Sequence, residues 1–502
     1  MMSTVFHTIR YLKPVQVCYR VRRRIPHSKP ASMPVPVHRA TNGHWQEQVF
    51  RKQSQVAPAR FRFLNEEREI TGWNDPSATR LWLYNLHYFA YPSPNLVDRW
   101  ISENPPGHGV GWDPYPLSLR VVNWIKWGLA GHELSPRILQ SLATQTRHLA
   151  SRIEYHLLGN HLIANMKALV FAGSWFAGGE AQRWLDQGLE GLGCEIAEQI
   201  LADGGHFERS PMYHSVITED LLDLVNLGHA YPSLLPDWSR VTARMLGWLD
   251  RMTHPDGGIS FFNDAAFGVA AAPDQLRQYA GRLGIDKDGC AALSDSGYVR
   301  LETGDTVVLF DAAPIGPDYQ PGHAHADTLS FELSHRGRRV LVNSGTSTYE
   351  PGPLRQWQRG TAAHNTLRVD RVDQSEVWKA FRVARRARLL GVRTDHIGFA
   401  EASHDGYRRL TDPVIHRRRV ELDNSEVVIT DCLEGRGRHT AEIFFHLHPE
   451  ATVDIHLDPK VIRGIEYTSF YPEFNIAVPN KTIVGTWTGE CPVEFRTVIR
   501  LQ

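Results

Sequence analysis

The segment from His323 to Asp327 places two histidines and an aspartate at alternate positions (323, 325 and 327), directly before alternating apolar residues at 329–333. If residues 328–333 form a strand, alternate side chains share one face, so His323, His325 and Asp327 lie in register with the apolar positions. Such groups are costly to bury unless they bind a metal, a substrate or one another. We therefore expect a site at the mouth of a β-domain. The alternative is a histidine-rich turn with satisfied hydrogen bonds.

Two predicted helix starts supply further polar groups. At the first, Asn160 and His161 precede the apolar stretch at 162–169, and Asn160 is well placed to cap that helix. A helix N-terminus also presents free N–H groups and the positive end of the helix dipole, which suits a substrate carboxylate. Both roles are compatible at this position.

The second helix start follows a glycine-rich loop, with Ser210 as the expected N-cap and Tyr213 in the first turn. The positive field there would favour the phenolate form of Tyr213, which a tyrosine base needs. A packed aromatic residue with one satisfied hydroxyl is the alternative. If the loop is a site, we expect its neighbours Glu208, Arg209 and His214 to contact the substrate.

Metal binding is a further chemistry that the histidines allow. His325, Asn343 and His364 would provide two imidazoles and an oxygen, a workable set for zinc if the strands bring them together. Asn343 is neutral and a weaker ligand than a carboxylate, and Asp327 is the alternative anionic ligand. For His364 the alternative is a turn at a strand edge whose side chains bond to the backbone.

The composition describes an ordinary globular protein. Hydrophobic residues make up 42% of the 502 residues, which is enough for large cores and two domains. Lys and Arg together number 55, as do Asp and Glu, so no overall field favours nucleic acid or a membrane surface as the main partner.

The beginning of the chain is basic. Lysines and arginines accumulate between Arg10 and Lys29, and the first acidic residue is Glu47. This stretch lacks the apolar region and cleavage site of an export signal, and no segment approaches the length of a membrane span. We therefore expect a cytoplasmic protein without a transmembrane segment. The basic stretch suits a solvated tail, the simpler interpretation, or contact with a membrane face or an acidic partner.

Two patterns divide the chain. From about residue 81 to 250 apolar residues recur at helical spacing between short loops, which predicts antiparallel helical hairpins. From residue 297 onward short alternating runs predict strands, and the order of helices first and strands afterwards indicates segregated layers. We predict a basic extension at 1–60, an all-helical domain at 61–290 and a β-domain at 291–502.

Taken together, these motifs resemble those of the heparinase II/III family of polysaccharide lyases and the related alginate lyases. The resemblance runs from about residue 70 to beyond 380, in family order. It rests on Gly159-Asn160-His161-Leu162, Glu208-Arg209-Ser210-Pro211-Met212-Tyr213-His214, Gly322-His323-Ala324-His325-Ala326-Asp327, Asn343-Ser344-Gly345 and Ala363-His364-Asn365-Thr366. It implies an (α/α) toroid followed by an antiparallel β-sandwich, in agreement with the pattern of helices and strands.

The resemblance also implies roles by motif position. Asn160 and His161 would bind and neutralise the carboxylate of a uronic acid, and Tyr213 and His323 would form the acid and base pair. A divalent metal, with zinc as first choice, would be held by His325, His364 and the residue at 343. The family commonly has Asp at position 343, and this chain has Asn. The implied reaction is β-elimination on an acidic polysaccharide, and the implied location is the periplasm.

Two other functions remain open. A glycoside hydrolase on a helical toroid needs two carboxylic acids about 5–9.5 Å apart across one bond. The candidates Glu208, Glu219, Asp220 and Asp264 form no evident pair by spacing. A non-catalytic carbohydrate-binding protein, for example in an exopolysaccharide pathway, would keep the fold without turnover, and Asn343 favours this alternative.

Overall fold

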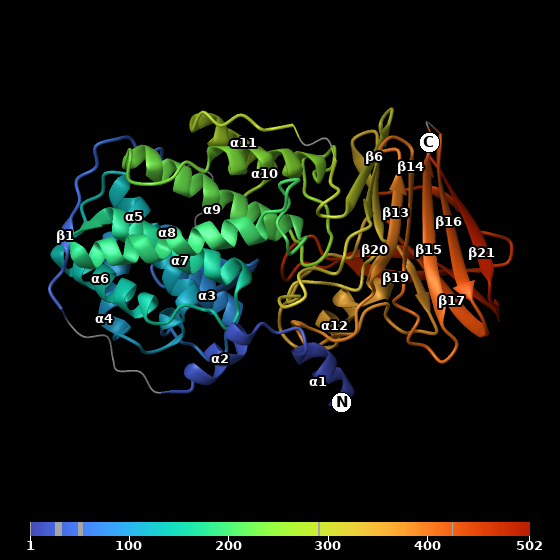
Figure 1. The fold of residues 1–502 in the computed structure, drawn as a ribbon, viewed down its shortest axis with the longest axis horizontal. Coiled ribbons are helices and arrows are strands. Elements are labelled where there is room, and N and C mark those ends of the chain that lie inside the picture. The colour runs from blue at the N-terminus through green and yellow to red at the C-terminus, as the bar shows by residue number, and fades with distance from the viewer. Residues whose placement is uncertain (1, 26–32, 49–53, 290–291, 424, 502) are drawn as a thin grey trace.

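The computed structural model describes residues 2–25, 33–48, 54–289, 292–423 and 425–501 (Figure 1). Helices make up the first half of the chain and antiparallel sheets the second half, so the predicted fold class is confirmed. The change falls between helix α11 (Pro273–Arg282) and strand β6 (Tyr298–Thr303). Within these described ranges, none of the helices has the length and apolar character needed to cross a membrane.

The helical half is an array of antiparallel helices around one large apolar core. Its helices are α3 (Arg80–Tyr88), α4 (Pro94–Glu103), α5 (Pro114–Leu129), α6 (Pro136–Ala150), α7 (Gly159–Trp175), α8 (Gly179–Gln199), α9 (Pro211–Ala230), α10 (Ser239–Arg251) and α11. Nearly every residue of α7 and most residues of α9 are buried, because both helices are apolar around most of their circumference. These two central helices start at the junction with the β half.

A small sheet precedes the helices, where an all-helical domain was expected from residue 61. Strands β2 (Gln55–Ala57), β3 (Arg60–Phe63) and β4 (Glu66–Glu69) pair in antiparallel order. The cause is an alternation with period two. Phe61 and Phe63 share one face, and Phe63 packs edge-on against Trp82, while the alternating Arg60 and Arg62 are exposed.

The β half contains three main antiparallel sheets, with strand orders β6-β7-β8-β9, β13-β14-β15-β16-β21-β18 and β10-β17-β20-β19. The remaining strands of these sheets are β7 (Thr306–Asp311), β8 (Phe331–His335), β9 (Arg338–Leu341), β10 (Leu367–Val369), β13 (Leu389–Thr394), β14 (Phe399–His404), β15 (Val414–Leu422), β16 (Glu426–Gly435), β17 (Arg438–His446), β18 (Asp454–His456), β19 (Ile462–Phe470), β20 (Val478–Glu490) and β21 (Val493–Arg500). Side chains from all three sheets meet in a second apolar core, among them Leu333, Val420 and Ile443.

The strand predicted at residues 328–333 begins only at Phe331, the first residue of β8. Leu329 has a φ of 65°, and the Ser330 N–H donates to the main-chain oxygen of Asp327, so the chain turns just before the strand. The histidines at 323 and 325 and Asp327 therefore lie on a loop. Their predicted register on a strand face is wrong, although all three are buried.

The basic extension contains two short helices, α1 (Met2–Ile9) and α2 (Pro14–Arg22), and is therefore not a simple solvated tail. The Trp378 indole of strand β11 (Val377–Trp378) donates to the Thr8 hydroxyl of α1 at 3.1 Å. On α2, the Gln16 amide donates to the main-chain oxygens of Leu157 and Tyr319 at 3.3 and 3.2 Å. The two helices lie along one edge of the molecule, below the junction of the two halves in the view of Figure 1.

Candidate active site

Tyr213 and His323 lie in direct contact at the junction of the two halves. Their ring centroids are 3.8 Å apart, and the ring planes are inclined by 28°. Tyr213 lies in the first turn of α9, where the Ser210 hydroxyl accepts the Tyr213 N–H at 3.1 Å, so the predicted N-cap is confirmed. His323 comes from the loop before β8. The two halves together thus place a phenol beside an imidazole.

The Asp264 carboxylate organises the histidine loop. Its Oδ2 accepts from Nδ1 of His323 at 2.9 Å, and its Oδ1 accepts from Nε2 of His325 at 2.8 Å. Both oxygens also bond to Arg355, from helix α12 (Pro353–Arg359). Burial alone would raise the pKa of Asp264, but the Arg355 guanidinium and the two imidazoles hold it well below its usual range. Asp264 is therefore ionised, and it fixes Nδ1 of His323 as the protonated ring nitrogen.

The Tyr213 hydroxyl lies 3.0 Å from the hydroxyl of Tyr349. Burial raises the pKa of Tyr213 well above its usual value, and Tyr349 and the carboxylates of Asp264 and Glu208 raise it further. The expectation that the helix dipole would favour a phenolate is therefore wrong, because burial and the neighbouring oxygens outweigh it. Tyr213 is a phenol, which can donate a proton.

The start of α7 brings Asn160 to the same place. The helix begins at Gly159, so Asn160 lies in the first turn and does not cap the helix as predicted. Its main-chain N–H donates to Oε1 of Glu208 at 3.3 Å, and Oε2 of Glu208 lies 3.8 Å from Nε2 of His323. Among the described residues, the buried oxygens Asn160 Oδ1 and Glu208 Oε2 have no hydrogen-bond partner. Unsatisfied buried polar atoms beside a phenol and an imidazole in contact are typical of a substrate site.

His161 is held by two neighbours. Its ring packs against Tyr115, with centroids 4.3 Å apart, and its Nδ1 lies 3.1 Å from Oε2 of Glu154. Burial raises the pKa of Glu154, but His161 and the Asn165 amide outweigh burial and lower it overall, so Glu154 accepts the hydrogen bond as a carboxylate. This contact orients the His161 ring at the first turn of α7.

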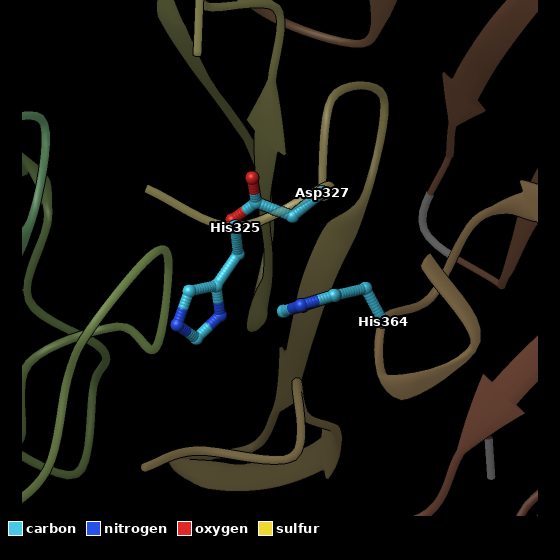
Figure 2. A group of neighbouring side chains, drawn as sticks. All are labelled: His325, Asp327 and His364. Carbon is cyan, nitrogen blue, oxygen red and sulfur yellow. The ribbon is translucent and has the colours of Figure 1, made fainter. Parts of the chain in front are cut away.

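Beyond Asp264, His325, Asp327 and His364 form a cluster that could hold a metal ion. One ligand atom from each of the three lies within 4.8 Å of the others. Figure 2 shows the two imidazoles pointing toward one another from separate segments, with the carboxylate beside them. Burial lowers the pKa of His325 to about 4 and that of His364 well below its usual value, so both imidazoles are neutral, as metal ligands must be.

The free atoms of this cluster fit a cation. In the described part of the chain, Nδ1 of His325 and both ring nitrogens of His364 are buried without a hydrogen-bond partner. The other nitrogen of His325 donates to Asp264, which is the usual arrangement behind a metal-bound histidine. Two imidazoles and a carboxylate are a ligand set that zinc accepts.

Two family profiles match the chain. The profile described as Heparinase II/III N-terminus matches residues 79–283, and that described as Heparinase II/III-like, C-terminal matches residues 286–493. The chain belongs to the heparinase II/III family. The motifs that resembled this family are therefore those of a true member.

Curated relatives of this family member include two kinds of protein. The heparin-sulfate lyase of Pedobacter heparinus is 27% identical over 313 residues, which cover 54% of this chain and 46% of the relative. That of Bacteroides thetaiotaomicron is 24% identical over 493 residues, covering 86% and 65%. The FtsZ-localized protein C of Caulobacter vibrioides is 28% identical over 409 residues, covering 74% and 68%. The chain spans less than two thirds of the length of either lyase.

Solved structures share the fold of this heparinase II/III family chain. Heparinase III aligns with a TM-score of 0.65 and 21% identity over 84% of this chain and 76% of that chain. The heparan sulfate lyase HepC from Pedobacter heparinus aligns with a TM-score of 0.56 and 18% identity over 97% and 87%. At these identities the likeness shows the fold, a helical domain followed by antiparallel sheets.

Asn343, at the position where the resemblance implied an Asp, is already bonded within the protein. Its Oδ1 accepts from the main-chain N–H of Asn365 at 3.2 Å, and its Nδ2 lies 3.5 Å from the Ser330 hydroxyl. The carboxylate in the histidine cluster comes from Asp327, which the sequence offered as the alternative ligand. Ligation by Asn343 stays a prediction.

Arg209 and His214 form hydrogen bonds within the protein. The Arg209 guanidinium donates to the main-chain oxygens of Ser296 and Phe207. His214 is buried, with Nδ1 accepting from the His206 N–H and Nε2 donating to the main-chain oxygen of Met245. These contacts hold the loop that carries Glu208. Substrate binding by Arg209 and His214 stays a prediction.

Three residues of the site had no assigned role from the sequence. Asp264, Tyr349 and Arg355 come from loops and a short helix without periodic pattern, and each makes its contact across the junction of the two halves. Asp264 stood only among the carboxylates considered for a hydrolase. The local sequence gives one signal: Asp264 and Arg355 lie in segments with aromatic residues close by, which favours burial of both charges.

Proposed function

We propose that the protein is a polysaccharide lyase that cleaves a uronic-acid-containing polysaccharide by β-elimination. The contact between Tyr213 and His323 carries the proposal, because it puts a proton donor and a proton acceptor side by side at the start of two helices. Asn160, with its unsatisfied buried amide oxygen, belongs to the same junction. Family membership supports the same chemistry.

Neutralising the substrate carboxylate is the first requirement of this reaction. The proton at C5 of a uronic acid is weakly acidic, because the adjacent carboxylate resists further negative charge. Asn160, His161 and the N–H groups at the first turn of α7 would stabilise that carboxylate as charge develops. Burial raises the pKa of Glu208, and its unsatisfied Oε2 lies at the same junction, 3.8 Å from Nε2 of His323.

Proton transfer then divides between His323 and Tyr213. Because Nδ1 of His323 donates to Asp264, its lone pair lies on Nε2, which takes the C5 proton. The C–H electron pair forms the C4–C5 double bond, and the C4–O4 bond breaks. Tyr213 gives its phenolic proton to the departing O4, and the proton on His323 then returns to the Tyr213 phenolate. Each such group is worth about 10²–10⁴ in rate.

A divalent metal, with zinc as first choice, would be held by His325, Asp327 and His364. It would supply a fixed positive charge that ties down the loop. Asp264 bonds to both His323 and His325, so a metal that fixes the position of His325 would also help to fix the position of His323, the proposed base.

The substrate is an acidic polysaccharide. The relatives named heparin-sulfate lyase make a sulfated glycosaminoglycan the first polymer to test. Such a substrate goes with a periplasmic protein, the location that the family resemblance implies, whereas a cytoplasmic one was expected from the sequence. Cell fractionation distinguishes these locations.

The test is the appearance of an unsaturated uronate, which absorbs in the near ultraviolet, when the protein meets heparin, heparan sulfate, chondroitin sulfate or alginate. Tyr213→Phe and His323→Ala should each lower kcat by about 10²–10⁴. Tyr467→Phe is the matched control, because Tyr467 is 82% exposed on β19. Cleavage without the chromophore would identify a hydrolase and overturn the proposal.

A second candidate is a carbohydrate-binding protein that keeps the site without turnover. Asn343 at the family's usual Asp position favours it, as does the relative FtsZ-localized protein C, whose name describes no lyase. Polymer binding that is equal in the wild type and in Tyr213→Phe, with no product from either, would establish this function in place of the first.

A further inference from the structure

The two N-terminal helices expose a concentration of large apolar side chains. On α1 these are Val5, Phe6 and Ile9, with exposed fractions of 39%, 59% and 53%. The spacing i, i+1 and i+4 places all three on one stripe of the helix. The buried Thr8 lies outside this stripe and holds α1 to the β half through Trp378.

The second helix continues the pattern. Val17 and Val21, spaced i and i+4, are 50% and 62% exposed, and Ile25 beyond the helix end is 59% exposed. Gln16 is fully buried on another side of α2 and donates to the main-chain oxygens of Leu157 in the helical half and Tyr319 in the β half. Contacts on the inner sides of both helices thus leave the apolar side chains facing outward. Scattered apolar residues are ordinary on a surface, but here six large ones are exposed within the first 25 residues, on or directly after two neighbouring short helices.

Cations accompany these apolar side chains. Arg10 follows α1, and Arg22, Arg23 and Arg24 end α2, and all four are exposed. Before Glu47 the chain contains no acidic residue, although the whole protein has equal numbers of acidic and basic residues. The positive charge is therefore local, and it lies on or beside the same two helices as the exposed apolar side chains.

We propose that this N-terminal surface binds an anionic lipid bilayer. The surface consists of Val5, Phe6, Ile9, Val17, Val21 and Ile25 with Arg10, Arg22, Arg23 and Arg24. Short amphipathic helices of this kind lie in the plane of the interface, with apolar side chains below the headgroups and guanidinium groups on the lipid phosphates. The bilayer is favoured over a soluble polyanion because a polyanion leaves the six apolar side chains in water.

The attachment of the two helices determines how the protein would lie on a membrane. α1 is attached to the β half through Trp378, and α2 is attached to both halves through Leu157 and Tyr319, so a membrane that binds both helices touches the protein beside the junction. The whole molecule then rests on the bilayer without any segment crossing it. This role is independent of the proposed lyase activity, and either can fail without the other.

The test is co-sedimentation of the full chain with vesicles. One set contains phosphatidylglycerol and phosphatidylethanolamine in equal parts, and the other contains phosphatidylcholine alone. We expect binding to the anionic vesicles at low salt, weakened at high salt because the Debye length shortens. Binding to phosphatidylcholine should be at least about tenfold weaker.

Two variants separate the contributions. Phe6→Ser with Ile9→Ser removes apolar contact, and Arg22→Gln with Arg24→Gln removes charge; each pair should weaken binding at least about tenfold. The first matched control is Ile465→Ser with Tyr467→Ser, exposed apolar residues on β19. The second is Arg336→Gln with Arg338→Gln, exposed arginines in the turn after β8 and at the start of β9. Both should bind as the wild type does. Thermal unfolding verifies that every variant is folded.

Several outcomes would overturn the inference. Absence of sedimentation with anionic vesicles at low salt would do so, as would equal binding by the wild type and the Phe6 and Ile9 pair. Retention on immobilised heparin that depends on Arg22 and Arg24, without vesicle binding, would assign the surface to a soluble polyanion instead.

Discussion

Arg355 and Asp264 form a two-point ion pair from which water is excluded. Nη2 of Arg355 lies 2.7 Å from Oδ2 of Asp264, Nη1 bonds to Oδ1, and neither side chain has exposed surface. The same carboxylate accepts from His323 and His325. The Arg355 guanidinium and the two imidazoles thus share one buried negative charge, which connects α12 to His323.

Removing Arg355 should therefore destabilise the protein strongly. Arg355→Met leaves Asp264 as a buried charge without its main partner, and loss of one member of such a pair typically costs about 3–5 kcal/mol. Urea unfolding of the two proteins measures the difference. The matched control is Arg60→Met, because Arg60 is 3.6 Å from Glu67 in an exposed pair and should contribute less than about 1 kcal/mol. Equal changes in the free energy of unfolding for the two variants would show that the buried pair stabilises the protein no more than the exposed pair does.

Some of this arrangement could be predicted from the sequence and some could not. Ser210 and Pro211 mark the start of α9 by local chemistry, and the apolar period marks the helices, because a few neighbouring residues determine both. The meeting of Tyr213 with His323 was predicted only through the family resemblance, since it joins segments from different halves.

The rest depends on contacts that a linear pattern does not contain. Leu329 adopts a positive φ, which turns the chain before β8 and removes the predicted strand register. Asn160 lies inside α7 because Gly159 extends the helix by a residue. Asp264 and Tyr349 lie on loops without periodicity, and their partners are determined only when the two halves pack together.

Tyr349 should raise the pKa of Tyr213, the proposed acid. Its hydroxyl is one of the groups that raise the pKa of Tyr213, after burial. If Tyr213 must be protonated to donate to O4, wild-type kcat/KM should not fall as the pH rises through about 10, the usual tyrosine value. In Tyr349→Phe the alkaline limb should move to lower pH, with a smaller loss of kcat than in Tyr213→Phe. If the alkaline limb does not move and matches that of the Tyr467→Phe control, Tyr349 does not raise the pKa of Tyr213.

Zinc binding should distinguish the two proposed ligand sets. If Asp327 supplies the anionic ligand, Asp327→Ala and His364→Ala should each weaken zinc binding by at least about 10²-fold, measured by titration calorimetry and metal content. Asn343→Ala removes a neighbour whose oxygen bonds to the main chain beside His364, and should cost no more than about tenfold. Equal losses for Asn343→Ala and Asp327→Ala would restore Asn343 to the ligand set.

Two buried histidines away from the metal cluster should make the protein sensitive to acid. Burial lowers the pKa of His87 and of His214 to about 3, whereas an unfolded histidine has a pKa of about 6.5. The unfolded chain therefore binds protons first as the pH falls. Their contribution to stability is fully present above about pH 6.5 and is lost progressively toward pH 3, by about 2 kcal/mol for each histidine at pH 5.

Urea unfolding at pH 7 and pH 5 measures this loss. His214→Gln should be less stable at pH 7, because it loses bonds to His206 and Met245, but its stability should fall by about 2 kcal/mol less between the two pH values. His229→Gln, at an exposed position near the end of α9, should keep the wild-type pH dependence. If His214→Gln keeps it too, protonation of buried His214 does not drive acid unfolding, and the ionised carboxylates such as Asp264 become the dominant groups.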